Sequence, residues 1–326
     1  MSARIIVTGP SLADEAMALL RERGVEAAFV PPYTTPADLA AMVARERPEA
    51  LLVRMGEIDD AVIGASDRLK AISKHGVGYN NIDVAAATRR GIPVMVAHAA
   101  NARSVAEMAM AMIYVLVKRL FALDAGLRAG RWEKPGFNGM ELTGKCLGIV
   151  GLGSIGRNLA ALAAPLAMRI LAFDPAVPEE AVPQGVRRVG SLAEMLGEAD
   201  VLSLNCPLTE TTRNIIGAAE LAAMKPTAFL INTARGGLID ENALAAALRD
   251  GVIAGAGIDS FATEPAPAEH PLWGLPNVIV TPHVAGVTRE ASARVGLQAV
   301  RNILTVFDGK RPDPVCVVNP EALTTA

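Results

Sequence analysis

The chain has 326 residues, of which 51% are hydrophobic and 20% charged, and its formal net charge at pH 7 is −3. This length and composition predict two globular domains with large cores. The small negative charge and the lack of a long Lys/Arg run argue against nucleic acid or an anionic membrane as a partner. Only Cys146, Cys206 and Cys316 are present, and their wide spacing predicts neither disulfides nor a metal site.

The N-terminus and the longest apolar stretch both indicate a cytoplasmic protein. Met1 to Arg4 lead directly into a strand-like run, without the apolar segment and cleavage site of a signal peptide. The stretch 105–117 contains Glu107 and is too short to span a bilayer. We therefore expect a buried helix there and a protein that stays in the reducing cytoplasm.

The first part of the chain alternates short β-branched runs with helical patterns. Strand-like runs cover 4–8, 26–30, 50–53, 69–72 and 92–96, and helical patterns cover 12–23, 36–45 and 81–90. This alternation is typical of a parallel sheet covered by helices. We expect a first α/β domain whose initial part ends near His98.

A second series follows an apolar helix expected over 104–120 and a polar, glycine-rich excursion over 126–144. Its strand-like runs cover 146–150, 169–173, 200–204, 228–231, 255–258 and 278–280. They predict a second doubly wound parallel sheet. The last expected helix, 289–308, should return to the first domain. The expected boundaries are residues 1–99 with 288–326 for the first domain and 100–287 for the second.

A glycine-rich pattern, G-x-G-x-x-G, follows the run 146–150 directly and opens a helix. In a dinucleotide site the first glycine permits a tight turn, the second lets backbone approach a pyrophosphate, and the third lets helix pack on strand. The amides at the helix N-terminus bind the phosphates. Such glycines can also mark a plain turn, but the order of strand, loop and helix favours the nucleotide. The predicted phosphate-binding residues are Gly151, Gly153, Ser154, Ile155 and Gly156.

Asp174 stands at the end of the next expected strand. Its carboxylate can accept hydrogen bonds from the adenosine ribose, and it would repel a 2′-phosphate. Pro175 and Ala176 follow it, so no adjacent arginine is available for that phosphate. The sequence therefore predicts NAD rather than NADP, with a solvated strand-end aspartate as the alternative.

Three loops after strands of the second series carry ionisable groups; they span 232–237, 259–265 and 281–286. Open α/β sheets bind ligands at this edge. Reduction of a 2-keto acid needs a cation for its carboxylate, an acid that protonates its carbonyl oxygen, and a group that holds that acid. Arg235, His283 and Glu264 supply this set. Taken singly, they could be a surface salt bridge, a structural histidine and a solvated acid.

With these motifs in place, the chain resembles the D-isomer-specific 2-hydroxyacid dehydrogenases along nearly its whole length. The matching segments are Gly76–Asp83, Ser104–Glu107, Gly151–Gly156, Asn232–Gly237, Gly257–Pro265 and Pro282–His283. The resemblance implies hydride transfer between NAD and a small 2-hydroxy or 2-keto acid, with Arg235, Glu264 and His283 as the catalytic triad. It implies a Rossmann domain inserted in a discontinuous, flavodoxin-like substrate domain, with the active site in the cleft.

The resemblance also implies further cofactor contacts. Asp259 would hold the nicotinamide carboxamide, Thr233 and Ala234 would line the same pocket, and Cys206 and Pro207 would border the adenine. Thr212 and Gly286 complete the predicted cofactor site.

Substrate binding is expected from the first domain. The loop Gly76, Val77 and Gly78 would present backbone amides to the substrate carboxylate, because glycine permits close approach. Arg54, with Lys74 and His75, could bind a phosphate, sulfonate or second carboxylate of the substrate. The alternative is that Lys74 and His75 are solvated.

Segments 130–133 and 137–142 look most like the 3-phosphoglycerate dehydrogenases, in which this excursion is usually a dimer arm. We therefore expect a homodimer with its arm at about 120–144. The chain departs from that branch at Lys74 and His75, where an arginine is usual, and it ends before the regulatory domain that many members carry. Hydroxypyruvate or glyoxylate reduction and sulfolactate oxidation stay open as alternatives.

A non-enzymatic alternative is an NAD-sensing protein similar to the C-terminal binding protein corepressors, which resemble the same fold. The lack of an evident partner groove or disordered extension argues against it. A formate dehydrogenase is a nearer alternative, but the glutamine usual there is replaced by Glu264.

Overall fold

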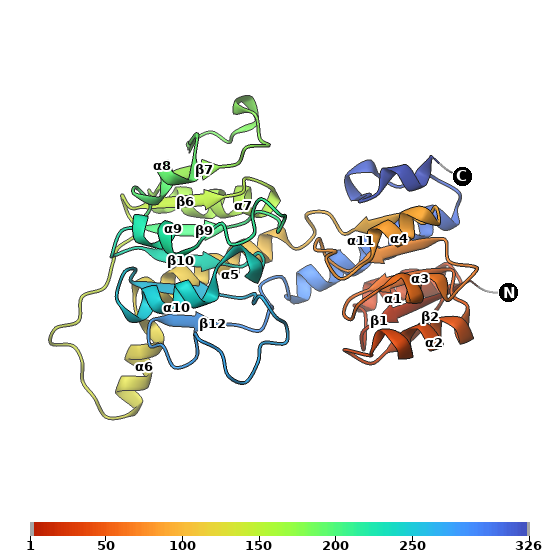
Figure 1. Ribbon diagram of the computed structural model, residues 1–326, viewed down its shortest axis with the longest axis horizontal. Helices are drawn as coiled ribbons and strands as arrows, with labels where there is room; N and C mark the ends of the chain where they lie inside the picture. Colours follow the sequence, from red (N-terminus) through yellow and green to blue (C-terminus); the bar gives the residue numbers. More distant parts are fainter. Residues whose placement is uncertain (1–2, 325–326) are drawn as a thin grey trace. The chain divides into compact units, whose positions relative to one another are not determined.

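The computed structural model describes residues 3–324, and the chain divides into two compact units. Unit 1 contains the chain up to Asn101 and again from Val287, whereas unit 2 is the continuous segment Ala102–Gly286. In Figure 1 the two ends of the colour scale meet in unit 1, where the blue helix α11 (Arg289–Phe307) lies beside the red helix α1 (Asp14–Glu22).

Unit 1 is built on a five-stranded parallel sheet. The strand order is β2-β1-β3-β4-β5, as in flavodoxin-like folds. The strands are β1 (Arg4–Thr8), β2 (Glu26–Val30), β3 (Ala50–Val53), β4 (Ala71–Lys74) and β5 (Val94–Val96). Besides α1 and α11, the helices are α2 (Pro36–Glu46), α3 (Asp60–Gly64) and α4 (Val84–Arg89).

Two hydrophobic cores cover the faces of this sheet. Successive side chains of a strand point to opposite faces, so Ile5 of β1 packs with Leu20 of α1 and Ile303 of α11. Its neighbour Ile6 packs on the other side, with residues of α2, α3 and α4. The last long helix therefore shares a core with the first strand.

One strand of unit 1 is shifted from its expected place. The run 69–72 predicts a strand, but the ladder of β4 begins at Ala71 and continues to Lys74. Leu69 instead packs into the core from the preceding turn, where its amide bonds to Ser66. The shift makes Lys74 the last residue of the strand, opposite Val53.

Unit 2 contains a seven-stranded parallel sheet. Its order is β12-β11-β10-β9-β6-β7-β8, which is the Rossmann order with one more strand at the edge. The strands are β6 (Cys146–Val150), β7 (Arg169–Phe173), β8 (Val186–Arg188), β9 (Val201–Leu204), β10 (Phe229–Asn232), β11 (Gly255–Ile258) and β12 (Val278–Val280). The sequence pattern does not predict β8, because Val186 is its one apolar residue.

Helices cover both faces of this second sheet. On one face, α5 (Ala102–Val117) and α7 (Ser154–Ala163) share a core with β6 and β10. The other face is covered by α8 (Leu192–Leu196), α9 (Ala218–Ala223) and α10 (Glu241–Arg249). The apolar helix expected near 104–120 is thus α5, buried as expected. No helix within residues 3–324 has the length and apolar character needed to cross a membrane.

The segment after α5 leaves the core of unit 2. In Figure 1, the yellow helix α6 (Leu120–Arg128) and the loop that follows it project from the rest of the unit. Three large apolar side chains are mostly exposed here: Phe121 at 63%, Leu127 at 59% and Trp132 at 72%. Exposed apolar side chains gathered on one segment are typical of a protein contact surface.

Candidate active site

Three neighbouring strands of unit 2 bring the predicted catalytic loops together. Asn232, Ile258 and Val280 lie side by side at the ends of β10, β11 and β12. Because the strands are parallel, the loops that follow them leave the same edge of the sheet. Arg235, Glu264 and His283 are carried by these loops.

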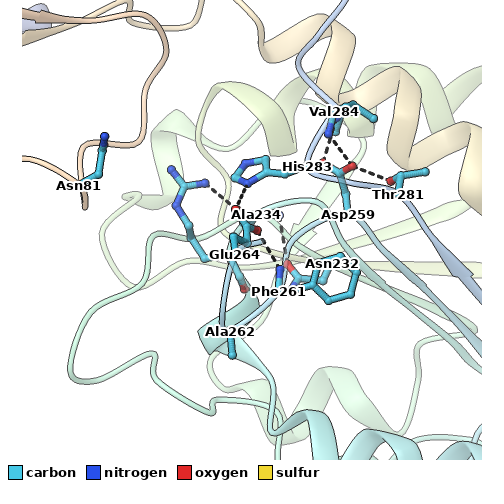
Figure 2. A network of polar contacts seen from close by, with 12 residues as sticks. Asn81, Asn232, Ala234, Asp259, Phe261, Ala262, Glu264, Thr281, His283 and Val284 are labelled. Atoms are coloured by element: carbon cyan, nitrogen blue, oxygen red, sulfur yellow. Dashed lines mark hydrogen bonds and ion pairs between the residues drawn. The ribbon is translucent and has the colours of Figure 1, made fainter. Parts of the chain in front are cut away.

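His283 and Glu264 form a direct pair. Nδ1 of His283 lies 2.7 Å from Oε2 of Glu264, and the side chains are 44% and 37% exposed (Figure 2). Glu264 accepts a hydrogen bond, so we assign the Nδ1 proton to the neutral imidazole. Nε2 is then the nitrogen that can take a proton from a ligand or return one.

The backbone of His283 adopts an uncommon conformation. Its φ angle is +53°, in the left-handed region that non-glycine residues rarely enter. Its N–H lies 2.7 Å from the carbonyl oxygen of Asp259 and 3.0 Å from that of Thr281. Surrounding contacts must fix such a conformation, and it is often found at functional sites.

Asp259 is the anchor of the loop that carries His283. Its side chain is fully buried, and Oδ1 accepts hydrogen bonds from the Thr281 hydroxyl at 2.6 Å and the Val284 amide at 2.9 Å. Oδ2 accepts the Ala285 amide at 2.9 Å. These contacts, drawn in part in Figure 2, give Asp259 a structural role in addition to the predicted contact with the cofactor.

Glu264 is held from a second side. Its Oε1 accepts the amide of Phe261 at 2.9 Å, while Oε2 faces His283. Burial alone would raise the pKa of Glu264, but the hydrogen bonds from His283 and Phe261 and the nearby positive charges outweigh it, so the pKa lies below its ordinary value. Glu264 is therefore ionised at neutral pH and suited to stabilise a protonated His283.

Arg235 is positioned by the turn after β10. Asn232 is fully buried, donates to the carbonyl oxygen of Arg235 at 2.8 Å and accepts the Ala234 amide at 3.1 Å. One guanidinium nitrogen of Arg235 donates to the Ala234 carbonyl oxygen at 2.6 Å. Burial lowers the pKa of Arg235, and the charge of Glu264 opposes this shift. An arginine keeps its charge nonetheless.

Gly236 lets the loops of Arg235 and Glu264 touch. A Cβ atom at Gly236 would lie 1.9 Å from the carbonyl carbon of Phe261 and 2.2 Å from the amide nitrogen of Ala262. No side chain fits there. The sequence alone predicts no such role for Asn232, Thr281 or Gly236. Asn232 holds the backbone of its own turn, Thr281 bonds to the Asp259 side chain, and Gly236 makes room for the backbone of another loop.

The glycine loop lies at the end of β6, beside the switch in strand order between β6 and β9. Gly151 has a φ angle of +94°, and its Cβ would lie 2.7 Å from the carbonyl carbon of Asn205. At Gly156 a Cβ would lie 2.2 Å from the carbonyl oxygen of Gly151. Both glycines are therefore required by the fold itself.

Gly153 is different, because a Cβ there would meet no atom within 4 Å. Gly153 caps α7 without a side-chain hydrogen bond to the first turn, which leaves the amides near Ser154 and Ile155 for a ligand. An open approach beside a ten-residue helix N-terminus fits a dinucleotide pyrophosphate. The buried Thr233 hydroxyl, which lacks a partner within residues 3–324, also fits a cofactor pocket.

Asp174 connects the glycine loop to the end of β7. Its Oδ2 accepts the Leu152 amide at 2.8 Å and its Oδ1 accepts the Ala176 amide at 2.9 Å. A carboxylate has about four acceptor positions, so ribose hydroxyls can still bind. Arg188 of β8 lies 3.4 Å from the Asp174 carbonyl oxygen, a proximity that the sequence did not reveal.

The predicted adenine border is an ordered loop after β9. The Thr212 hydroxyl donates to the Pro207 carbonyl oxygen at 2.7 Å and accepts the Thr209 amide at 2.7 Å. Burial raises the pKa of the Cys206 thiol to about 11. Cys206 is therefore a neutral side chain suited to packing rather than a nucleophile.

The predicted substrate residues lie in unit 1, at the ends of β3 and β4. Arg54 donates from its guanidinium to the Ser11 carbonyl oxygen. Lys74 Nζ lies 3.2 Å from the Arg54 carbonyl oxygen and 2.9 Å from Asn81 Oδ1. Gly76 adopts a φ angle of +145°, and Val77 and Gly78 follow it in the same loop. Unit 1 thus gathers two cations beside a glycine loop.

His75 adds no positive charge to the predicted substrate residues at neutral pH. Burial, aided by the charges of Arg54 and Lys74, lowers the pKa of His75 to about 4. Its buried Nε2 has no partner in the described part of the chain. His75 is therefore neutral at pH 7, and the cationic part of the predicted cluster is reduced to Arg54 and Lys74.

Relatives of known activity match most of the chain. A D-3-phosphoglycerate dehydrogenase of Methanocaldococcus jannaschii is 40% identical over 315 residues, which are 96% of this chain and 59% of that protein. A (S)-sulfolactate dehydrogenase of Chromohalobacter salexigens is 42% identical over 256 residues, or 78% of this chain and 83% of that protein. The chain thus spans about three-fifths of the first relative.

A solved structure has the same fold throughout. A crystal structure of a protein from Thermus thermophilus has a TM-score of 0.88 and 36% identity, and it covers 97% of this chain and 99% of its own. Residues 110–285 match the family described as D-isomer specific 2-hydroxyacid dehydrogenase, NAD binding domain. The chain belongs to the D-isomer specific 2-hydroxyacid dehydrogenase family.

Proposed function

We propose that the protein is an NAD-dependent dehydrogenase that interconverts a small 2-keto acid and the corresponding D-2-hydroxy acid. The observation that carries this proposal is the His283–Glu264 pair, 2.7 Å apart, on a loop edge shared with Arg235. A histidine held by a carboxylate can exchange one proton in either direction near neutral pH. Membership of the family is consistent with this chemistry.

Each of these residues would have a separate role in the reaction. Bound NADH would supply the hydride that reduces C2 of the keto acid. His283 would give its Nε2 proton to the carbonyl oxygen, so the products are the 2-hydroxy acid, NAD⁺ and neutral His283. Glu264 would stabilise the protonated imidazole before that transfer. Arg235 would bind the substrate carboxylate through its planar guanidinium.

NAD is proposed as the cofactor in preference to NADP. Asp174 carries the negative charge at the position where the ribose 2′-oxygen is expected, and a 2′-phosphate would be repelled there. The glycine loop, the open approach at Gly153 and the uncapped start of α7 would hold the pyrophosphate. The remaining predicted contacts, Thr233, Ala234, Asp259 and Gly286, would surround the nicotinamide.

An acid with an anionic tail is the proposed substrate class. Arg54 and Lys74 place two cations near the end of β4 and the Gly76 loop. The relatives that oxidise phosphoglycerate and sulfolactate act on acids of this kind by name. Unit 1 would then act as the substrate domain and unit 2 as the cofactor domain.

We also propose a homodimer in the cytoplasm. The projecting segment around α6 exposes Phe121, Leu127 and Trp132, and a second copy would cover this apolar surface. Light scattering of the wild type and of Trp132→Asp would compare their masses. A wild type with the mass of one chain would contradict the dimer.

The activity is tested with purified protein and NADH. Phosphohydroxypyruvate, sulfopyruvate, hydroxypyruvate, glyoxylate and phenylpyruvate are compared by kcat/KM from the loss of NADH absorbance. We expect the phosphate or sulfonate acid to give the highest value. If no 2-keto acid is reduced while NADH still binds, the dehydrogenase proposal is wrong and a non-enzymatic NAD-binding role takes its place.

A further inference from the structure

A second histidine–glutamate pair lies in unit 2 outside the catalytic set. Nε2 of His270 lies 3.1 Å from Oε2 of Glu241, and the side chains are only 4% and 16% exposed. Neither residue stands in a motif that the sequence alone would single out. Buried charged or polar groups are costly unless their partners satisfy them, so the pair calls for an explanation.

Glu241 connects this pair to the turn that carries Glu264. Glu241 is the first residue of α10, and its other oxygen, Oε1, accepts the amide of Ala262 at 2.8 Å. The preceding amide, that of Phe261, donates to Glu264 at 2.9 Å. Two consecutive amides of one turn are thus held by two carboxylates, one of which is the partner of His283. Figure 2 shows Phe261, Ala262 and Glu264 within this turn.

His270 is itself fixed by its surroundings. Its ring packs edge-on against Phe261, with the centroids 5.4 Å apart, and lies 4.6 Å from the ring of Trp273. Its Nδ1 accepts the Leu272 amide at 3.3 Å. Since Nδ1 is an acceptor, the proton of the neutral ring lies on Nε2, where it is donated to Glu241. The ring, the carboxylate and the turn therefore form one connected set.

A second close contact also restricts the turn. The backbone of Gly236 touches Phe261 and Ala262 so closely that a Cβ would not fit. The turn is therefore in contact with both the loop of Arg235 and the Glu241–His270 pair. Two such contacts keep the carboxylate that the turn carries in one place.

We propose that Glu241 and His270 are positioning residues that hold the Glu264 carboxylate at hydrogen-bond distance from His283. This inference rests on the proposed dehydrogenase function and adds two residues to its machinery. Neither residue touches the reacting atoms. Without Glu241 the Ala262 amide loses its acceptor, the turn becomes mobile, and the distance between Glu264 and His283 varies. A displacement of about 1 Å at a catalytic group can lower the rate about 100-fold.

The test compares kcat of four variants of the full chain. Glu241→Ala removes both hydrogen bonds, and we expect kcat to fall by about 10- to 50-fold, within the range for a displaced catalytic group. Glu241→Gln keeps an oxygen for the Ala262 amide but turns its NH2 group towards the His270 Nε2–H, so it should recover only part of the loss. His270→Phe keeps the aromatic packing but lacks the Nε2 donor, so an intermediate loss is expected. Glu269→Ala removes an exposed acid beside His270 and should match the wild type.

Two further measurements separate positioning from a general loss of structure. NADH affinity by fluorescence titration should stay within about twofold of the wild type in Glu241→Ala, because the glycine loop is untouched. Glu241→Ala should also have little further effect on kcat in a Glu264→Gln background. Residues that act through one another are non-additive in such a cycle.

The outcomes also distinguish this inference from the proposed function. If the wild type reduces no 2-keto acid, the proposed function fails first. If the wild type is active but Glu241→Ala and His270→Phe keep kcat within twofold, the positioning role is wrong. Full additivity with Glu264→Gln would equally overturn it, because the effect would then not pass through Glu264.

Discussion

The amide of His283 donates to the carbonyl oxygen of Asp259 at 2.7 Å, and the Asp259 carboxylate binds the residues on both sides of it. The backbone of His283, in the loop after β12, is thus fixed to Asp259, the residue that follows β11. Its side chain is fixed separately, by Glu264. Two independent attachments leave the imidazole with one free nitrogen, Nε2, in a defined direction, as general acid–base chemistry requires.

His283→Ala is expected to lower kcat by about 10²- to 10⁴-fold, the usual contribution of a general acid or base. NADH affinity should change little, because the glycine loop and Asp174 are unaffected. Steady-state kinetics and an NADH fluorescence titration measure the two effects. A near-normal rate in this variant would remove His283 from the mechanism.

Arg235→Lys is expected to lower kcat/KM for the keto acid by about 10- to 100-fold, because a lysine cannot form the forked contact with a carboxylate. Buried lysines also lose their charge readily, and the site of Arg235 is buried enough to lower its pKa. Arg213→Lys, a change in an exposed arginine of the same unit, serves as the matched control. Equal kinetics for the wild type and Arg235→Lys would contradict the assignment.

Much of the fold could be predicted because its signals are local. The glycine loop follows β6 directly, and alternating apolar runs mark most strands of both sheets. β8 was missed because an edge strand of three residues with two arginines carries no apolar pattern. The strand at 69–72 was misplaced because Leu69 is as apolar as a strand residue but is buried from a turn.

In the candidate site, the sequence predicts only those residues whose side chains have a recognisable chemical role. Arg235, Glu264 and His283 stand out as ionisable groups in loops after strands. The contacts that hold them are not visible in this way. Gly236 and Glu241 act on the backbone of a turn distant in sequence, and Asn232 acts on the backbone of its own turn through a polar side chain without a charge. The sequence places His75 beside two basic residues, but burial, which lowers its pKa, cannot be predicted from its neighbours in sequence.

Asp259→Ala is expected to lower the free energy of unfolding of unit 2 by about 3 kcal/mol, because one buried and two part-buried donors lose their acceptor and each unpaired donor costs about 1–3 kcal/mol. Denaturant titration monitored by tryptophan fluorescence is suitable, since both tryptophans, Trp132 and Trp273, lie in unit 2. Asp250→Ala, at the exposed end of α10, is the control. A change below 1 kcal/mol would show that the anchor is dispensable.

Asp174→Asn is expected to weaken the preference for NAD over NADP by at least about tenfold. The asparagine oxygen can still accept the Leu152 amide, so the glycine loop is retained, but the negative charge is lost. Arg188 then lies close enough to attract a 2′-phosphate. The ratio of kcat/KM for NADH and NADPH measures the change. An unaltered ratio would show that Asp174 does not set the specificity.

His75, whose Nε2 atom is buried, predicts an acid sensitivity of unit 1. Its pKa is lowered from 6.5 to about 4 in the folded chain, mainly by burial. The unfolded chain therefore binds a proton between these values that the folded chain does not, and stability falls as the pH drops from 6.5 towards 4. Above pH 6.5 the histidine is neutral in both states and the penalty is absent.

For this pKa shift, the free energy of unfolding at pH 5 is about 2 kcal/mol lower than at pH 7.5. His75→Leu removes the titrating group and the unpartnered Nε2. Between pH 7.5 and pH 5, the variant should therefore lose about 2 kcal/mol less stability than the wild type. Unfolding of unit 1 is followed by hydrogen exchange at β1 and β4 at pH 5, 6 and 7.5, with rates corrected for pH. Parallel pH profiles for the wild type and His75→Leu would mean that His75 is not buried as a neutral group.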